Sequence, residues 1–207
     1  MNRPLGVILA GGLATRMGGG DKGLLELGGQ SILGHVIARI KPQAGVLALN
    51  ANGDAARFAE FGLPVIADSI GGYAGPLAGV LAGLDWAADQ GAMAIVTVAA
   101  DTPFFPNELV SLLQTAANAA GAPIALAATP HAKRGQVRHP TFGLWPVSLR
   151  DDLRAALGRG VRKVVLWTDG HGAATALFDA SAYDPFFNVN TPQDLDRARA
   201  MLAEGVV

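Results

Sequence analysis

Five short runs of uninterrupted apolar residues set the strongest limit on how this chain can fold. They occupy residues 5–10, 46–49, 65–67, 92–100 and 124–128. Strands with one solvated face alternate apolar and polar residues, whereas continuous runs are typical of strands buried on both faces. We therefore expect five buried strands within the first 128 residues.

Helix-like segments separate these runs. Ser31 can cap the first, whose apolar side would hold Ile32, Val36, Ile37 and Ile40. Start and stop signals mark three further segments, from Asp54 to Gly62, from Pro76 to Gly91 and from Asn107 to Gly121. This alternation of strand and helix predicts an α/β fold in three layers, α-β-α and Rossmann-like, around a mainly parallel sheet.

The chain beyond residue 128 has a weaker pattern. Residues 129–141 read as a polar loop leading to a strand at 142–145, and helices are expected at 148–157 and 162–168. Another strand is expected at 174–178. Thr191, Pro192 and Asp194 resemble a capping box at the start of a last helix. No linker or repeat divides the sequence, so we expect a single domain over residues 1–207 with an irregular second half.

Composition excludes several classes of function. The 207 residues include 16 basic and 17 acidic side chains, and this formal charge of −1 offers no basic field to nucleic acid or a membrane surface. There is no cysteine, so disulfides and thiolate metal sites are excluded. The N-terminal apolar run is too short for a signal peptide, and no run approaches the roughly 18 residues that span a bilayer. We therefore expect a cytoplasmic protein that binds neither nucleic acid nor membrane.

Polar residues follow the predicted strands at the edge where open parallel sheets bind ligands, outside the carboxyl ends of the strands. A glycine-rich loop follows the first strand, Asn50 and Asn52 follow the second, Asp68 the third and Asp101 the fourth. These groups are expected to form one polar pocket that can hold a cation.

The glycine-rich loop is the clearest of these signals. Gly11, Gly12 and the glycines at 18–20 leave backbone N–H groups open to an anion, and Arg16 and Lys22 add positive charge. The loop fits neither the G-x-G-x-x-G fingerprint nor the Walker A sequence. A phosphate-binding loop of another kind is favoured over the alternative, a surface turn with solvated cations.

Asp101 is the candidate metal ligand, because Mg²⁺ prefers one or two carboxylates together with phosphates and water. The alternative is an Asx turn that ends the strand. Chemistry alone leaves a similar alternative, a local turn or a packing role, open for the other polar candidates: Asn50, Asn52, Asp68, His139, Asn188 and Asn190.

Taken together, these segments resemble the nucleotidyltransferases with a GT-A-like, Rossmann-type fold. Residues 9–27, LAGGLATRMGGGDKGLLEL, are similar more narrowly to the molybdenum cofactor guanylyltransferases, whose loop reads R-M-G-G-x-D-K-G-L. The resemblance covers nearly the whole chain in order, through NAN (50–52), ADS (67–69), GPLAGV (75–80), ADTPFFP (100–106), HPTFGLW (139–145) and FFNVNTPQDL (186–195). The chain departs from the family pattern at Ala100, often Cys, at residues 29–32, usually G-x-P-L, and at Gly53, where N-A-N is commonly followed by Arg.

The resemblance implies transfer of GMP from GTP to the terminal phosphate of molybdopterin, which yields the guanine dinucleotide cofactor and pyrophosphate with Mg²⁺ as the metal. It makes Arg16, Lys22 and Asp101 catalytic, with Asp101 also binding Mg²⁺. The positions matching GTP contacts are Leu9, Ala10, Gly11, Gly12, Lys22, Asn50, Asp68 and Asp101.

The acceptor needs a second half-site, so we expect a nucleotide-binding half, about 1–128, and an acceptor-side half, about 129–207. Candidates for binding the acceptor are Arg134, Arg138, His139, Asn188 and Asn190. Expected protein partners are those that insert the cofactor and mature molybdoenzymes.

Two alternatives remain. A molybdopterin cytidylyltransferase or a sugar-phosphate nucleotidyltransferase would share the fold, although LAGG rather than LAAG favours guanine. A non-catalytic carrier of the cofactor would be a different class of protein. The set Arg16, Lys22 and Asp101 argues against a carrier, which has no need of Mg²⁺-dependent triphosphate chemistry.

Overall fold

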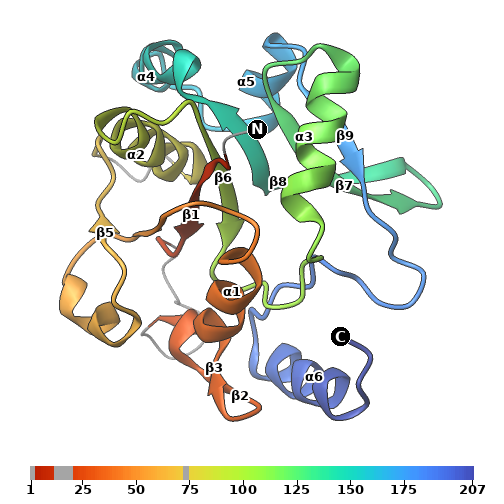
Figure 1. Cartoon of the computed structure of the whole chain (residues 1–207). Coiled ribbons are helices and arrows are strands. Elements are labelled where there is room, and N and C mark those ends of the chain that lie inside the picture. Colours follow the sequence, from red (N-terminus) through yellow and green to blue (C-terminus); the bar gives the residue numbers. More distant parts are fainter. Residues whose placement is uncertain (1–2, 12–20, 72–74) are drawn as a thin grey trace.

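A seven-stranded sheet runs through the centre of the molecule in the order β5-β4-β1-β6-β8-β7-β9 (Figure 1). The computed structural model describes residues 3–11, 21–71 and 75–207. The strands are β1 (Leu5–Leu9), β4 (Leu47–Asn50), β5 (Val65–Ile66), β6 (Ala94–Ala99), β7 (Ala125–His131), β8 (Gly135–Pro146) and β9 (Ala174–Leu177). Only β8 among them runs against its neighbours, which confirms a mainly parallel sheet.

Helices cover both faces of this sheet. Helices α2 (Pro76–Asp89), α4 (Arg150–Gly158) and α5 (Val164–Gly170) pack on one face, and α1 (Ile32–Ile40) and α3 (Leu109–Ala120) on the other. Successive residues of β1 point to opposite faces of the sheet. Val7 therefore packs in the core under α2, α4 and α5, and Ile8 packs in the core under α1 and α3. Both are fully buried, as the continuous apolar runs predict. The three-layer α-β-α fold is confirmed.

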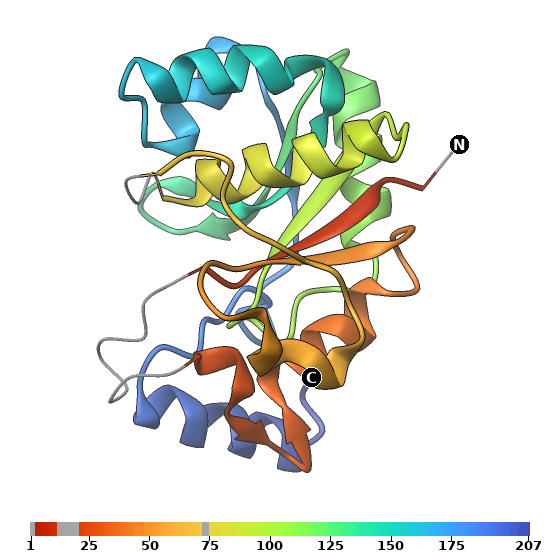
Figure 2. The ribbon, with the colours of Figure 1, turned by 90° about the vertical axis from the view of Figure 1, so that its left-hand side faces the viewer.

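A third, smaller core lies at the end of the molecule where α6 (Pro192–Ala203) meets a two-stranded hairpin (Figure 2). The hairpin consists of β2 (Glu26–Leu27) and β3 (Gln30–Ser31) and follows the 3₁₀ turn η1 (Lys22–Leu24). Its turn residues, Gly28 and Gly29, have φ values of 63° and 91°, which glycine adopts at little cost. The Gly-Gly pair was a hairpin signal that the sequence prediction did not use.

Several predicted caps are confirmed. The side chain of Ser31 accepts a hydrogen bond from the Gly34 N–H at the start of α1, and Thr191 and Asp194 form the capping box of α6. Asp54 caps a 3₁₀ helix, η2 (Ala55–Phe61), which ends at Gly62 in the left-handed conformation. The predicted helix at 148–157 begins as a 3₁₀ turn, η3 (Val147–Leu149), and the regular α-helix starts at Arg150.

The prediction of a polar loop at residues 129–141 was wrong. Strands β7 and β8 continue through this region as a hairpin, paired from Thr129 with Val137 to His131 with Gly135. The side chains near the tip of the hairpin are exposed, so the sequence there lacks the apolar pattern of a buried strand. The strands are instead held together by backbone hydrogen bonds, which leave no pattern in the sequence. Because β8 also pairs with β6, strands from both predicted halves of the chain share one sheet.

The predicted cap at Asn107 was also wrong. Helix α3 begins at Leu109, and the N-cap position is Glu108, whose side chain makes no capping bond. The backbone N–H of Val110 instead donates to Oε1 of Gln43 at 3.1 Å. Gln43 lies 67 positions earlier in the chain, so this cap is a tertiary contact that local sequence signals do not reveal.

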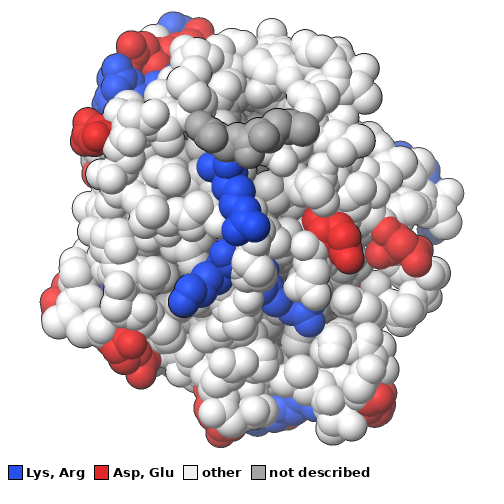
Figure 3. All heavy atoms as spheres, in the orientation of Figure 1, with Lys and Arg blue, Asp and Glu red and all other residues white. Residues whose placement is uncertain are grey.

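Charge is sparse on the face drawn in Figure 3, where a few basic side chains follow a line near the middle and acidic side chains lie toward the margins. Most of that face is uncharged. Within the described residues, every helix is too short or too polar to cross a lipid bilayer.

Replacement of Gln43 by Met tests the tertiary cap. The change removes the acceptor for Val110 and the amide that donates to the carbonyls of Arg39 and Pro106. We expect a loss of about 1–2 kcal/mol in the free energy of unfolding, measured with denaturant, since one buried donor is left unsatisfied. Asn107→Ala is the matched control and should change stability by less than about 0.5 kcal/mol. A larger loss of stability in Asn107→Ala than in Gln43→Met would instead support a local cap at Asn107.

Candidate functional site

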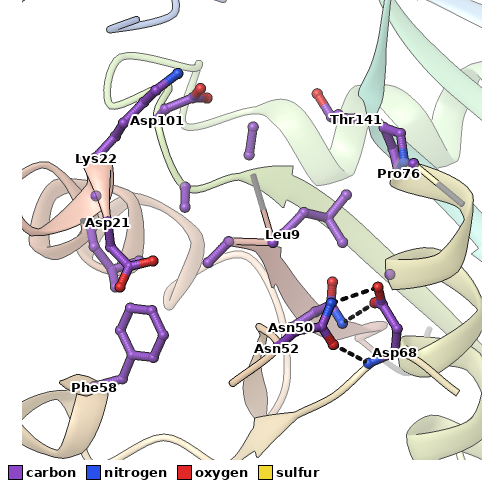
Figure 4. A pocket seen from close by; sticks show the side chains of 18 residues that line it. Leu9, Asp21, Lys22, Asn50, Asn52, Phe58, Asp68, Pro76, Asp101 and Thr141 are labelled. Atoms are coloured by element: carbon purple, nitrogen blue, oxygen red, sulfur yellow. Dashed lines mark hydrogen bonds between the residues drawn. The ribbon is translucent and has the colours of Figure 1, made fainter. Parts of the chain in front are cut away.

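A cavity of about 310 Å³ opens at the carboxyl end of the parallel strands, the edge where the strand order predicts a ligand site (Figure 4). Its wall combines ends of β1, β4 and β6, the loop after β5, the start of α2 and residues near η1. The lining residues are Leu9, Ala10, Gly11, Asp21, Lys22, Gly23, Leu33, Asn50, Asn52, Phe58, Asp68, Gly75, Pro76, Gly79, Ala99, Ala100, Asp101 and Thr141.

The candidate nucleotide contacts within the described residues all line this cavity: Leu9, Ala10, Gly11, Lys22, Asn50, Asp68 and Asp101. They come from positions up to 92 residues apart in the sequence, and parallel pairing brings them together. Gly12 and Arg16 lie outside the described residues. Their predicted roles, like the roles of the others in binding and catalysis, remain predictions.

A network of amides holds Asp68 at one end of the cavity (Figure 4). Asn50 Nδ2 donates to Asp68 Oδ1 at 3.0 Å, and Asn52 Nδ2 donates to Oδ2 at 2.8 Å. The Asp68 N–H in turn donates to Asn52 Oδ1 at 2.9 Å. The two asparagines are therefore more than turn formers, since they fix the orientation of a carboxylate that faces the cavity.

Lys22 and Asp101 lie together at the other end of the cavity, away from Asp68 (Figure 4). Lys22 Nζ donates to Asn190 Oδ1 at 2.7 Å. The hydroxyl of Thr102 lies 3.2 Å from Asp101 Oδ1 and also bonds Asn188 Oδ1. The segment before α6 thus packs directly against the two charged groups.

Asp101 is a mostly buried carboxylate. Burial raises the pKa of Asp101, and a hydrogen bond from Thr102 and the charge of Lys22 offset part of this increase. A buried anion in this setting is stabilised by an added cation. No group of three or more His, Asp or Glu side chains suited to a metal occurs among the described residues, so a metal held here would need ligands from substrate and water. This is the coordination that Mg²⁺ prefers.

The other candidate acceptor residues lie apart from the cavity lining that the structure describes. Arg138 forms an ion pair with Asp169 at 2.5 Å, and Arg134 is exposed near the tip of the β7–β8 hairpin. The ring of His139 stacks on Phe186 with centroids 4.2 Å apart, and its Nε2 is 3.0 Å from Thr129 Oγ1. Of the five candidates, the structure brings only Asn188 and Asn190 against Lys22 and Thr102.

Several cavity residues were not among the sequence candidates, notably Asp21, Phe58, Gly79 and Thr141. Gly79 is the most constrained of these, because a Cβ there would lie 2.2 Å from Asn50 Oδ1 and 2.8 Å from Leu9 Cδ2. The absence of a side chain on α2 thus lets the Asn50 amide reach Asp68. A glycine inside a predicted helix was the available signal, since it often marks a close approach.

Comparison with known proteins agrees with this arrangement. Residues 6–173 match the MobA-like NTP transferase domain. The chain belongs to this family. A molybdenum cofactor guanylyltransferase of Bradyrhizobium sp. is 50% identical over 201 residues, which cover 96% of this chain and 92% of that protein.

Solved structures share the MobA-like fold at lower identity. Molybdopterin-guanine dinucleotide biosynthesis protein A of Archaeoglobus fulgidus superposes with a TM-score of 0.69 at 22% identity, over 97% of this chain and 99% of that one. A CMP:2-keto-3-deoxy-manno-octonic acid synthetase complexed with CTP gives 0.71 at 14% identity, over 99% and 100%. Because a CTP-bound enzyme shares the fold, the MobA-like fold alone does not select the base.

Gly79→Ala tests the close approach between α2 and Asn50. The added methyl group must displace the Asn50 amide or the Leu9 side chain, so we expect a loss of about 1–3 kcal/mol in the free energy of unfolding, and weaker nucleotide binding. Gly158→Ala, in α4 with open space around the added carbon, is the matched control. It should be neutral or stabilising by up to about 1 kcal/mol. Equal effects at both positions would contradict the assignment of Gly79.

The pH dependence of stability tests the burial of His139 in this MobA-like fold. Burial lowers the pKa of His139, partly offset by the charge of Asp184. The unfolded chain therefore takes up a proton first, so this contribution to stability is complete above about pH 6.5 and is lost as pH falls through the folded value. Wild-type protein should lose more unfolding free energy than His139→Gln between about pH 7.5 and pH 5. Parallel pH profiles would show that His139 is not held neutral.

Proposed function

We propose that this MobA-like protein transfers GMP from GTP to the terminal phosphate of molybdopterin and releases pyrophosphate. The observation behind the proposal is the single cavity that combines the Lys22–Asp101 pair with the Asn50–Asp68–Asn52 network at the carboxyl edge of the sheet. Support for the substrates comes from the relative at 50% identity, which is named a molybdenum cofactor guanylyltransferase. The cofactor formed would pass to proteins that insert it into molybdoenzymes.

The nucleotide would span the cavity between these two groups. The strand-end backbone at Leu9, Ala10 and Gly11 would lie against GTP, and Asn50 and Asp68 would bind its polar donors. Lys22 would place positive charge on the triphosphate, where it would stabilise the pyrophosphate as it leaves. Arg16 would act with Lys22 on the same phosphates.

Asp101 would hold Mg²⁺, in keeping with its burial and its raised pKa. When bound, the ion would offset the negative charge that develops as the bond to pyrophosphate breaks. The positive charge of Lys22 beside Asp101 would limit the net negative charge of the site before the ion binds.

The acceptor would enter on the side of Asn188 and Asn190, which adjoin Thr102 and Lys22. Its phosphate is already an anion at neutral pH, so in-line attack on the α-phosphorus requires positioning rather than a general base. The neutral amide of Asn190 accepts a hydrogen bond from Lys22, so the acceptor would enter beside the charge that holds the triphosphate. Arg134, Arg138 and His139 would contact the more distant parts of the acceptor.

Release of pyrophosphate from GTP, with and without molybdopterin, tests this function. We expect release that depends on molybdopterin, is lost with a chelator and returns with Mg²⁺. Asp101→Ala should lower kcat by at least about a hundredfold, because a charge-stabilising group at the reacting phosphates is removed. Asp196→Asn, at an exposed ion pair on α6, is the control and should leave the rate unchanged.

Three outcomes would contradict the proposal. A preference for CTP over GTP would make the protein a cytidylyltransferase. Transfer to a sugar phosphate but not to molybdopterin would assign another acceptor. Binding of the cofactor with no release of pyrophosphate would indicate a carrier.

A further inference from the structure

Arg57 joins three parts of the cavity wall through one guanidinium group. Its Nε forms an ion pair with Asp21 Oδ2, Nη1 donates to the carbonyl of Asp54, and Nη2 donates to the carbonyl of Asn52 at 2.7 Å. The guanidinium carbon also lies 4.6 Å from the centre of the Phe58 ring, which is buried in the cavity wall. The planar fork of arginine suits this combination, whereas lysine offers a single point charge.

This contact differs from the exposed ion pairs of the molecule. The side chains of Arg57 and Asp21 are 28% and 19% exposed, against 47% and 76% for Arg199 and Asp196. Exposed pairs contribute little, because solvent screens them and both side chains lose freedom. A half-buried pair at a cavity is screened less, so its charge balance matters to an ion that binds nearby.

Two of the three hydrogen-bond partners of Arg57 lead to residues of the candidate site. Asp21 lines the cavity and directly precedes Lys22, whereas the amide of Asn52 holds Asp68 at the opposite end. Without Arg57, the carboxylate of Asp21 would lose this ion pair and would face an incoming triphosphate with its negative charge. The charge of Lys22 would then be partly cancelled by its own neighbour.

Gly53 lies beside the guanidinium group of Arg57, and its φ is 83°. A Cβ built on Gly53 would lie 3.4 Å from Arg57 Nη1, so the guanidinium fills the space beside the missing side chain. The guanidinium group of Arg57, a residue of η2, therefore places a positive charge at this corner of the cavity.

We propose that Arg57 is a positioning residue for nucleotide binding, which neutralises Asp21 beside Lys22 and ties the Asn52 loop to the end of the glycine-rich loop. This role rests on the proposed function, because it assumes that an anionic nucleotide binds beside the neutralised Asp21. Arg57 acts through Asp21 and Asn52 and lies outside the set of cavity-lining residues that the structure describes.

GTP binding by Arg57→Met, Asp21→Asn and the double variant tests the proposal, with calorimetry in the absence of acceptor. We expect Arg57→Met to weaken GTP binding by about tenfold, and by less at high salt, where the exposed carboxylate of Asp21 is screened. Adding Asp21→Asn should restore most of the affinity. Asp21→Asn alone should bind GTP at least as tightly as the wild type, and Arg57→Lys should be intermediate.

Two further measurements distinguish this role from a general structural one: the kinetics of the transfer reaction in Arg57→Met, and GTP binding by a variant of a second arginine. In Arg57→Met, KM for GTP should rise as the affinity falls, while kcat changes by less than about threefold, as for a lost ground-state contact. Arg154→Met, which breaks the ion pair with Asp85 between α4 and α2, should leave GTP binding unchanged. Unchanged binding in Arg57→Met, no rescue by Asp21→Asn, or weakened binding in Asp21→Asn alone would overturn the proposal. Absence of pyrophosphate release by wild-type protein that binds GTP would instead overturn the proposed function.

Discussion

Parallel pairing of β1 with β4 and β6 is the constraint on which the site depends. In this register Leu9 lies beside both Asn50 and Ala99, and Asn50 lies beside Ile66. The ladder continues past the strand ends, where Ala10 N–H donates to the Asn50 carbonyl at 2.8 Å and Ala100 N–H to the Leu9 carbonyl at 3.0 Å. A slip of one residue would move a strand end by about 3.3 Å and turn its side chains to the other face, so the cavity exists only in this register.

Acidic side chains surround a cavity whose proposed ligand is itself an anion, and each is balanced in a different way. Asp68 accepts hydrogen bonds from two amides, Asp21 pairs with Arg57, and Asp101 has Lys22 nearby and a pKa raised by burial. Amides orient a carboxylate without removing its charge, which suits the proposed role of Asp68 in accepting hydrogen bonds from a ligand. Burial disfavours the charge of Asp101, so this carboxylate is well suited to a divalent cation.

Sequence signals predicted what is decided locally. The β1 run, the Ser31 cap and the Thr191–Asp194 capping box depend on neighbouring residues, and their positions agree with the structure. The convergence of Asn50, Asp68 and Asp101 also followed from sequence, because it needs only parallel order and strand ends. The cap of α3 by Gln43 and the reach of Arg57 to Asp21 could not be predicted, since both join segments whose approach is set by tertiary packing. The β7–β8 hairpin was missed because its outer part is held by backbone bonds and has no apolar pattern.

The division into a nucleotide half and an acceptor half is least distinct at Asp101. The Val189 N–H donates to the Asp101 carbonyl at 2.8 Å, so the segment before α6 is fixed to the end of β6 by the backbone as well as by the side chains on either side. Val189 itself is fully buried in the third core with Leu27 and Ile32. Packing of α6 on the β2–β3 hairpin therefore determines where Asn188 meets Thr102 and where Asn190 meets Lys22. The third core also anchors the chain that follows Lys22, through Leu27 and Ile32. An acceptor phosphate bound by the two asparagines and a triphosphate bound by Lys22 would therefore be positioned by the same core.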